Sequence, residues 1–245
     1  MIVKNLASIL IINFNNAAYL DRAIRSCLNQ TYKNIEILIF DDKSSDGSQF
    51  ILEKYKKNNK IRYFLNKSKK MKIPAFDARN AYNYLIGKCR GEILFMLDSD
   101  DFFLKDKVLK IFKKFNTNRK INFIQDLPLL LLKNNKIIYK KNSNNIFSYW
   151  PYLSPMSCIS FRKNFILKYN KSNISILNKF PYVWLDFRTA VFSYYVDKSF
   201  YSLNDNLTGY MPHGESKKYK TFGISWFIRR KNSFDYFNYI TKKKS

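Results

Sequence analysis

A regular alternation of short apolar runs and helical patterns between residues 6 and 97 is the feature that most constrains this fold. The apolar runs have strand length and cover residues 6–12, 35–40, 61–65 and 93–97. Apolar residues at helical spacing separate each run from the next. Strands that alternate with helices form a parallel sheet covered on both faces. We therefore expect an α/β fold with a doubly wound, mostly parallel central sheet.

The helical patterns in this region predict which side chains are buried. The first helix follows the capping-type pair Asn15 and Asn16. The second helix places Phe50, Ile51 and Tyr55 on one face. The stripes expected on the first and third helices are Leu20, Ile24, Cys27 and Leu28, and Ala78, Ala81, Tyr82 and Leu85.

Beyond residue 120 the regular alternation gives way to a looser pattern. Residues 123–132 and 136–139 predict a hairpin around residues 133–135. Prolines punctuate the chain between residues 151 and 181, and we expect helices over 183–194 and 225–240. The second half is therefore expected to add an irregular region to the parallel sheet.

The chain carries a large positive charge, since 44 Lys and Arg residues against 18 Asp and Glu residues give a net charge of +26. Such an excess attracts nucleic acid, an anionic membrane or a phosphorylated ligand. It also arises without selection for any partner, because codon drift in an AT-rich genome enriches Lys together with Asn, Ile, Phe and Tyr. The composition alone leaves both explanations open.

Cysteine content and hydropathy bear on the compartment. Cys27, Cys89 and Cys158 are far apart and odd in number, so we expect neither a disulfide framework nor a zinc site, and a reducing cytoplasm is the natural compartment. No apolar run reaches the roughly 18 residues that a spanning helix needs. The run that starts at Leu6 is too short for a signal peptide. We expect a soluble chain, or one that lies on a membrane.

Polar residues follow three of the predicted strands, where an open parallel sheet binds its ligands. They are Asn13 and Asn15 after the first strand, Asp41 and Asp42 after the second, and Asp98, Asp100 and Asp101 after the fourth. Crowded carboxylates cost stability unless a cation or a donor compensates. Their oxygens suit Mg²⁺ or Mn²⁺, which also bind phosphate. The last group therefore predicts a metal site; the alternative is an acidic turn that caps a helix beginning near Lys105.

Other functional classes lack their motifs. No Gly-x-Gly-x-x-Gly follows the first strand, and the sequence has neither a P-loop nor a Gly-x-Ser-x-Gly elbow. Instead, six segments in order and spacing resemble the family 2 glycosyltransferases of the GT-A fold. They are residues 8–16, 28–32, 41–48, 78–81, 91–92 and 97–101.

The resemblance implies an enzyme that moves a sugar from a nucleotide-sugar donor to an acceptor hydroxyl, with inversion at the anomeric carbon. It implies a GT-A domain over residues 1–220, with a donor half over 1–115 and an acceptor half over 116–220. A basic, aromatic helix and tail over 221–245 would follow. Specificity is expected to lie in the loops after residue 102, where the resemblance is weakest.

The resemblance also assigns residues to the donor nucleoside. Ile12, Asn13 and Asn15 are expected to lie against the base and ribose. Asp42 would accept a hydrogen bond from the base, and Asp41 would order the turn.

A second set is assigned to the diphosphate and its metal ion. Arg79 would face the diphosphate, because a guanidinium binds two oxygens in one plane. Asp98 and Asp100 would form the metal-diphosphate motif, with Asp101 close enough to share that duty. His213, the single histidine, would complete the metal site or touch the diphosphate; alternatively it is a loop residue bonded to backbone.

The acceptor hydroxyl must lose its proton to a carboxylate base. The resemblance assigns this role to Asp186, although Leu185 stands where the family commonly has a second acid. Asp197 and Asp205 are the alternatives. A purely structural reading of Asp186 is a carboxylate that interacts with a helix N-terminus.

The partners expected from these assignments are a nucleotide-sugar donor and a saccharide or glycolipid acceptor, as in the synthesis of surface polysaccharide or lipopolysaccharide at the cytoplasmic face of the membrane. The aromatic and basic C-terminal segment suits peripheral contact with an anionic leaflet, or else packs its aromatic side chains on the domain. Nucleic acid is not the expected partner. The competing hypothesis is a GT-A frame that has lost catalysis and binds nucleic acid or anionic lipid.

Overall fold

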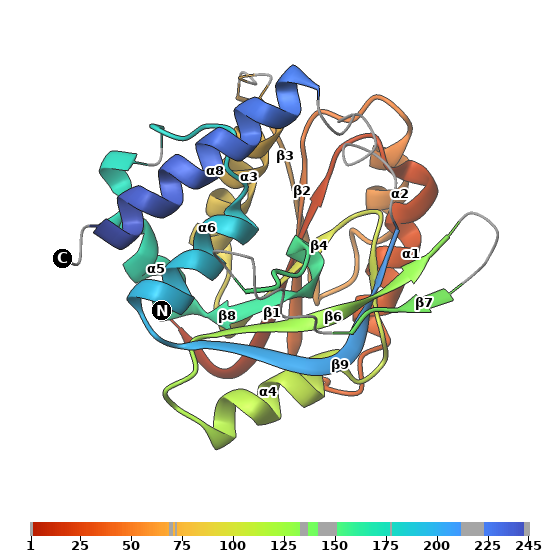
Figure 1. The fold of residues 1–245 in the computed structure, drawn as a ribbon. Helices are drawn as coiled ribbons and strands as arrows, with labels where there is room; N and C mark the ends of the chain where they lie inside the picture. The colour runs from red at the N-terminus through yellow and green to blue at the C-terminus, as the bar shows by residue number, and fades with distance from the viewer. Residues whose placement is uncertain are drawn as a thin grey trace.

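The computed structural model describes residues 2–68, 71, 73–132, 137–141, 151–176, 178–211 and 223–242, and its strands form one nine-stranded sheet (Figure 1). The strands are β1 (Val3–Asn13), β2 (Ile35–Asp41), β3 (Ile61–Leu65), β4 (Gly91–Asp98), β5 (Phe102–Phe103), β6 (Phe123–Leu131), β7 (Ile137–Tyr139), β8 (Ile159–Arg162) and β9 (Phe200–Tyr210). The α-helices are α1 (Ala17–Leu28), α2 (Ser48–Lys54), α3 (Pro74–Lys88), α4 (Lys107–Thr117), α5 (Lys163–Ser172), α6 (Leu185–Val191) and α8 (Ile224–Lys242). Shorter helical turns are η1 (Met156–Cys158), η2 (Ile174–Ile176) and the π-helical η3 (Phe192–Val196).

The strand order is β3-β2-β1-β4-β8-β6-β9-β5, with β7 beside β6. β1 pairs in parallel with both β2 and β4, and β2 pairs in parallel with β3, which confirms the predicted doubly wound half. From β8 onward the strand directions mix, since β8 runs antiparallel to β4 and β6 while β9 runs parallel to β6. The predicted hairpin is confirmed by the antiparallel pair of β6 and β7.

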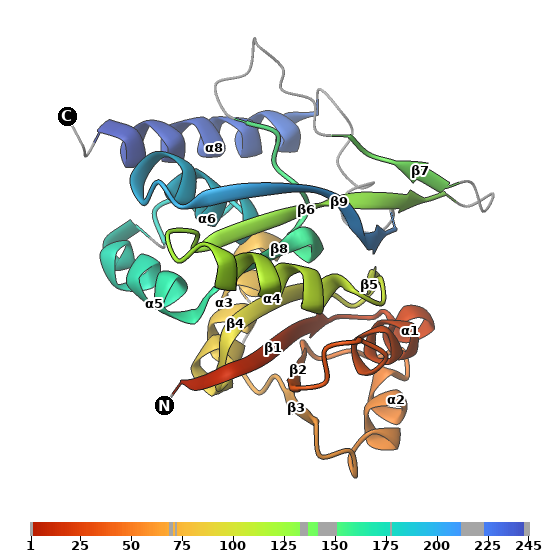
Figure 2. The ribbon, with the colours of Figure 1, turned by 90° about the horizontal axis from the view of Figure 1, so that it is seen from below.

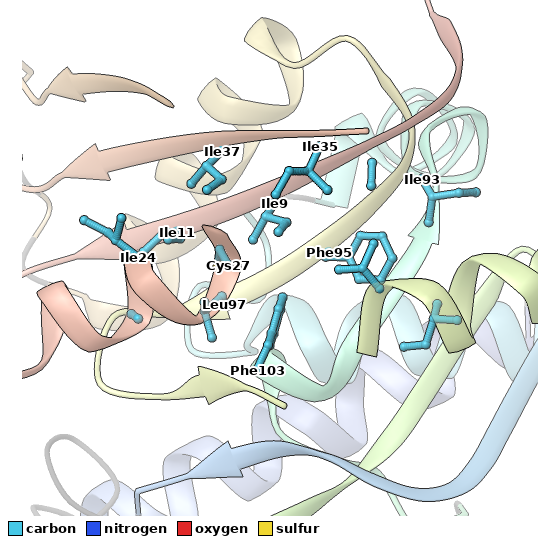
Figure 3. Close-up of a cluster of buried hydrophobic side chains, with 14 of the residues drawn as sticks. Ile9, Ile11, Ile24, Cys27, Ile35, Ile37, Ile93, Phe95, Leu97 and Phe103 are labelled. Carbon is cyan, nitrogen blue, oxygen red and sulfur yellow. The ribbon is translucent and has the colours of Figure 1, made fainter. Parts of the chain in front are cut away.

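Alternate residues of β1 face two different layers of helices. Ile9 and Ile11 belong to a buried cluster with side chains of α1, α2 and α4, whereas Leu10 packs with side chains of α3 and α5. Figure 1 shows α1 and α2 on one side of β2 and α3 on the other, and Figure 3 shows Ile24 and Cys27 of α1 beside β1. Because both faces of the sheet are buried, its central strands are continuous apolar runs.

Helix α8 lies outside α6 and adds a further layer to the second half (Figure 2). Tyr236 and Ile240 are buried in a cluster with Phe180 and Val191, and the hydroxyl of Tyr236 donates to the carbonyl of Arg188 at 3.1 Å. The helix predicted over residues 225–240 is therefore confirmed, while the domain boundary at residue 220 stays a prediction. None of the described helices has both the length and the hydropathy to cross a membrane.

Two local predictions for the first half of the chain were only partly right, since α1 does begin directly after Asn16. The side chain of Asn16 does not cap α1; it donates to the hydroxyl of Ser99 at 3.0 Å, and the first backbone N–H of α1 donates to Asp46 at 2.7 Å. Phe50 was expected on a buried face but is 79% exposed. Helix α2 has only seven residues, and Leu52 is its buried apolar side chain.

Glu36 joins several chain segments at the amino ends of the strands. It is 4% exposed and accepts hydrogen bonds from the hydroxyl of Ser8 at 2.6 Å and from the backbone N–H groups of Arg90 and Gly91 at 2.5 and 3.1 Å. The guanidinium groups of Arg62 and Arg90 lie 3.0 and 3.1 Å from its other oxygen. This one carboxylate therefore connects β1, β2, β3 and the start of β4.

We expect Glu36→Gln to lower the free energy of unfolding by about 2 kcal/mol at pH 7, because charged hydrogen bonds are lost in a buried place. Burial raises the pKa of Glu36, but the hydrogen bonds from Ser8 and Arg90 outweigh it and hold the pKa below 4.5. This contribution is present above pH 4.5 and is lost as the pH falls through the lowered pKa. The difference between the two proteins in urea unfolding should therefore shrink below pH 4. An equal difference at pH 7 and pH 3.5 would contradict this account.

Candidate functional site

The carboxyl ends of β1, β2 and β4 bring the predicted polar residues to one edge of the sheet. In the parallel register Asn13 lies opposite Asp41, and Ile12 lies opposite Asp98. The N–H of Ser99 donates to the carbonyl of Ile12 at 3.2 Å, so the ladder continues one residue past β4. The three loops therefore meet where an open parallel sheet places its ligand.

Asp41 is fully buried and is satisfied by its own turn. Its Oδ1 accepts from the amide of Asn13 at 2.7 Å and from the hydroxyl of Ser44 at 2.6 Å. Its Oδ2 accepts from the backbone N–H of Ser44 at 3.1 Å. The carboxylate thus fixes the loop after β2 against the end of β1.

Asn15 and Asp42 stand on either side of this turn. Asn15 has a φ of 52°, donates its N–H to the hydroxyl of Ser44 at 2.9 Å and accepts from the N–H of Ser45 at 2.8 Å. Asp42 is 8% exposed, and its Oδ1 accepts from the amide of Asn66 at 2.5 Å. The structure therefore holds both residues in fixed orientations beside Asn13.

The loop after β4, residues 98–101, is called here the acidic loop, and four contacts hold its first three residues. The buried hydroxyl of Tyr82 donates to Asp98 at 2.9 Å. The N–H of Asp98 donates to the hydroxyl of Ser157 at 3.0 Å. The guanidinium of Arg22 donates to the carbonyl of Asp100 at 2.7 Å. Together with the contact between Asn16 and Ser99, these bonds set the path of the loop.

Asp101 closes the loop at the bottom of the site. It is 1% exposed, and its Oδ1 accepts from the N–H of Met211 at 2.9 Å. Burial and the charges of Asp100 and Asp98 raise the pKa of Asp101 well above its usual range. Burial and the charges of Asp100 and Asp186 raise the pKa of Asp98 to about 7. Burial and the neighbouring carboxylates therefore make the ionised forms of Asp98 and Asp101 unfavourable.

A divalent cation would offset the repulsion between these carboxylates. Oδ2 of Asp101 is buried and has no hydrogen-bond partner among the described residues. Cations lower the free energy of crowded carboxylates, and carboxylate oxygens are the ligands that Mg²⁺ and Mn²⁺ prefer. In the described part of the chain, no three His, Cys, Asp or Glu side chains are arranged to hold a metal ion together, Asp98, Asp100 and Asp101 included. His213 lies outside the described residues, so its assignment stays a prediction.

Asp186 stands in the first turn of α6 and is partly buried. It accepts the N–H of Phe187 at 2.7 Å. Burial raises its pKa to about 6, against the opposing effects of that hydrogen bond and of the charge of Arg229. Its charge also raises the pKa values of Asp98 and Tyr82.

Asp186 lines a pocket of about 490 Å³. The other lining residues are Pro128, Leu130, Lys140, Tyr152, Leu153, Ser154, Pro155, Phe187 and Tyr210. Aromatic and aliphatic side chains dominate this list, and Asp186 is its one acid. Asp197 and Asp205 lie elsewhere, bound to Lys168 at 2.8 Å and Lys110 at 3.0 Å. The pocket thus distinguishes Asp186 from the two alternative carboxylates.

Arg79 is more deeply buried than expected for a side chain that faces a donor site. It is 2% exposed, its guanidinium lies 4.5 Å from the centre of the Phe76 ring, and it donates to Asn178 at 3.4 Å. Burial and the charge of Arg188 lower the pKa of Arg79 to about 10. Arg79 lies one turn before Tyr82 on α3, and its role toward a diphosphate stays a prediction.

Sequence reasoning missed most of the groups that hold the acidic loop. Arg22, Ser157 and Met211 come from distant parts of the chain and form no motif with it. Tyr82 was read only as part of an apolar stripe. A tyrosine on the buried face of a helix usually finds a hydrogen-bond partner, which was the one available signal.

Comparison with known proteins gives a consistent result. The family model described as Glycosyl transferase family 2 matches residues 8–180. A glycosyltransferase of Haemophilus influenzae, described as uncharacterized, is 38% identical over 110 residues, which are 43% of this chain and 40% of that protein. The GalNAc(5)-diNAcBac-PP-undecaprenol beta-1,3-glucosyltransferase of Campylobacter jejuni is 32% identical over 110 residues, 44% of this chain and 34% of that protein. The chain thus spans about 40% or less of these relatives.

Solved structures resemble the fold at low sequence identity. Staphylococcus aureus TarS 1–349 in complex with UDP-GlcNAc has a TM-score of 0.61 and 16% identity, and the match covers 97% of this chain and 70% of that one. The mannosyltransferase PcManGT from Pyrobaculum calidifontis, in complex with GDP-Man and Mn²⁺, has a TM-score of 0.56 and 12% identity, covering 82% and 54%. These matches support the predicted GT-A fold.

Without a divalent cation, the acidic loop is expected to become more destabilising as the pH rises. The pKa of Asp98 is raised from 3.8 to about 7, so its favourable contribution is full below pH 3.8 and is lost as the pH rises through 7. Asp98→Asn removes this titration and keeps an oxygen for the Tyr82 hydroxyl. In urea unfolding, the free energy of unfolding of Asp98→Asn should exceed that of the wild type by an amount that grows between pH 5 and 7. The growth should be up to about 1.4 kcal/mol per pH unit. A gain that does not change with pH would refute this.

Proposed function

The chain belongs to glycosyltransferase family 2, and we propose that it transfers a sugar from a nucleotide-diphosphate sugar to an acceptor hydroxyl. Two observations support this proposal: the parallel register sets the acidic loop beside the ends of β1 and β2, and the charge of Asp186 acts on Asp98. A donor and an acceptor must meet within one cleft for direct transfer. The carboxylates of the acidic loop and the carboxylate of α6 supply its two sides.

For the donor nucleoside, we propose the surface formed by Ile12, Asn13, Asn15 and Asp42. The amide of Asn13 donates to Asp41 at 2.7 Å and to Ser44 at 3.1 Å, which fixes the end of β1 beside this surface. Asp41 would act indirectly, because its hydrogen bonds to Asn13 and Ser44 hold the turn. The solved relative TarS contains UDP-GlcNAc, which supports a nucleotide-sugar as the ligand class.

For the diphosphate, we propose that Asp98 and Asp100 hold Mg²⁺ or Mn²⁺, with Asp101 sharing the ion. The buried, unpartnered oxygen of Asp101 and the mutual repulsion of these carboxylates support a cation here. When bound, such an ion would stabilise the charge that develops on the departing nucleoside diphosphate. Arg79 would add positive charge from α3. The presence of Mn²⁺ in the mannosyltransferase structure is consistent with this assignment.

For the acceptor, we propose the pocket lined by Asp186, Tyr152, Phe187 and Tyr210. Sugar rings present apolar C–H faces that suit aromatic side chains, while their hydroxyls need a polar partner such as Asp186. A carboxylate with a pKa of about 6 is ionised at neutral pH and can take the proton of the attacking hydroxyl. Attack on the face opposite the diphosphate would invert the anomeric carbon. The acceptor class would be a saccharide or glycolipid, as the name of the Campylobacter relative suggests.

Substitution of Asp186 and of Asp100 should separate chemistry from donor binding. We expect Asp186→Asn to reduce transfer roughly 10³-fold with nucleotide affinity unchanged, since only the base is lost. Asp100→Ala, the matched carboxylate control, should instead weaken metal-dependent nucleotide binding. The measurements are transfer from a nucleotide-sugar panel with Mn²⁺ and calorimetric binding of the nucleoside diphosphates. Wild-type transfer should also rise with pH through about 6, as Asp186 ionises.

Other outcomes of that experiment have distinct meanings. Loss of nucleotide binding in Asp186→Asn would make its role structural. A wild type that neither binds nor cleaves any nucleotide-sugar would overturn the enzyme proposal. Salt-sensitive binding to DNA or to vesicles without metal-dependent nucleotide binding would then favour the degenerate GT-A frame.

We also propose that α8 holds the enzyme at the anionic cytoplasmic face of a membrane. Ile224, Phe227, Ile228 and Phe234 are 81%, 55%, 43% and 41% exposed and share one side of α8 with Lys231. Figure 2 shows α8 at the outer side of the molecule, away from β1 and β2. Apolar side chains beside basic ones suit an anionic lipid surface, and the net charge of +26 strengthens the attraction.

Phe227→Ser combined with Ile228→Ser should weaken binding to phosphatidylglycerol vesicles by at least roughly 10-fold, because two apolar side chains no longer enter the interface. Vesicle co-sedimentation at low and moderate salt gives the measurement. Phe50→Ser is the matched control, since Phe50 is 79% exposed on α2. Equal binding of both variants and the wild type would exclude α8 as the attachment surface.

A further inference from the structure

A buried ammonium group lies behind the acidic loop. Lys107 begins α4 and Asp126 belongs to β6; both side chains are fully buried, with Nζ 2.6 Å from Oδ2. The same Nζ donates to the carbonyl of Ser157 and to the hydroxyl of Thr208, each at 2.6 Å. Thr208 donates in turn to Oδ1 of Asp126 at 2.7 Å. The ammonium therefore donates to acceptors in η1 and β9 and forms an ion pair with the carboxylate of Asp126 in β6.

Two of these segments also hold the acidic loop. The hydroxyl of Ser157 accepts from the N–H of Asp98, while its carbonyl is bound by Lys107. Met211, whose N–H donates to Asp101, follows Thr208 by three residues at the end of β9. These two backbone hydrogen bonds, which join the acidic loop to the second half of the chain, thus come from segments that one ammonium joins.

Stability alone gives little reason for this arrangement. Burying two charges costs desolvation energy, and apolar side chains of similar volume often replace a buried pair without loss of stability. A network of charge-assisted hydrogen bonds fixes the relative positions of the groups that it joins, because its bonds are directional. An apolar contact does not impose such fixed positions. The arrangement is therefore better explained by what it positions than by what it stabilises.

We propose that Lys107, Asp126 and Thr208 form a positioning cluster that sets the spacing of Ser157 and Met211, and through them the geometry in which the acidic loop binds a metal–diphosphate. The inference rests on the proposed function of that loop. It assigns an indirect role to three residues that touch neither donor nor acceptor.

The test compares Thr208→Val, which keeps the shape and removes the hydroxyl, with Thr208→Ser, which restores it. Binding of UDP, GDP, ADP and dTDP is measured by calorimetry with Mn²⁺ and with EDTA, and the ratio of the two affinities is the readout. We expect Thr208→Val to reduce this ratio roughly 10-fold, as outer-shell substitutions do, and Thr208→Ser to recover it. Ser193→Ala is the control, because it removes another buried hydroxyl, in η3, bonded to Ala190 at 2.9 Å.

The outcomes separate the two proposals. A lower melting temperature for Thr208→Val with an unchanged affinity ratio would overturn the positioning role. A wild type without metal-dependent nucleotide binding would overturn the proposed function itself, and this inference with it. If Thr208→Val does not fold, the double variant Lys107→Met/Asp126→Leu replaces it, because it leaves no buried charge unpaired. That variant should show the same reduced ratio, and an unchanged ratio would again overturn the inference.

Discussion

The parallel register of β1 between β2 and β4 is the constraint on which the rest of the site depends. It sets Asn13 beside Asp41 and Ile12 beside Asp98 without any contact between their side chains being required. The strands themselves must be apolar, because helices cover both of their faces. Polar chemistry is thereby confined to the loops at the strand ends, and the register decides which loops become neighbours.

The aspartates at this edge of the sheet differ in the number of hydrogen-bond donors around them. Asp41 is fully buried, yet its own turn and Asn13 supply donors to both of its oxygens. Asp98 and Asp101 receive fewer donors and repel Asp100 and each other, so their pKa values rise. Proteins commonly accept such local instability where a ligand will later compensate for it. The contrast separates a carboxylate that builds the loop from carboxylates that remain able to bind a ligand.

The sequence could predict those parts of the molecule that depend on local pattern. The strands of the first half and the residues at their ends follow from hydrophobic period alone. The predictions for Asn16 and Phe50 were only partly right because tertiary partners decided both, with Asp46 supplying the cap and Leu52 the buried contact. Strand β9 was missed because much of it is only partly buried and its sequence lacks a clean alternation. The contacts of Ser157 and Met211 with the acidic loop join residues 59 and 110 positions apart, which no local pattern records.

The short strand β5 has a consequence for the shape of the sheet. The chain leaves β4 at Asp98 and rejoins the sheet at Phe102, yet β8, β6 and β9 lie between these strands. In a flat sheet that separation would be about 19 Å, from four interstrand steps of about 4.8 Å. The four Cα-to-Cα steps from Asp98 to Phe102 reach at most about 14 Å. The sheet must therefore curl until its far edge comes back toward its centre, and the acidic loop is the tether that limits how far it can open. An insertion between Ser99 and Asp101 would thus alter the curvature of the whole second half, so the length of this loop is as constrained as its charge.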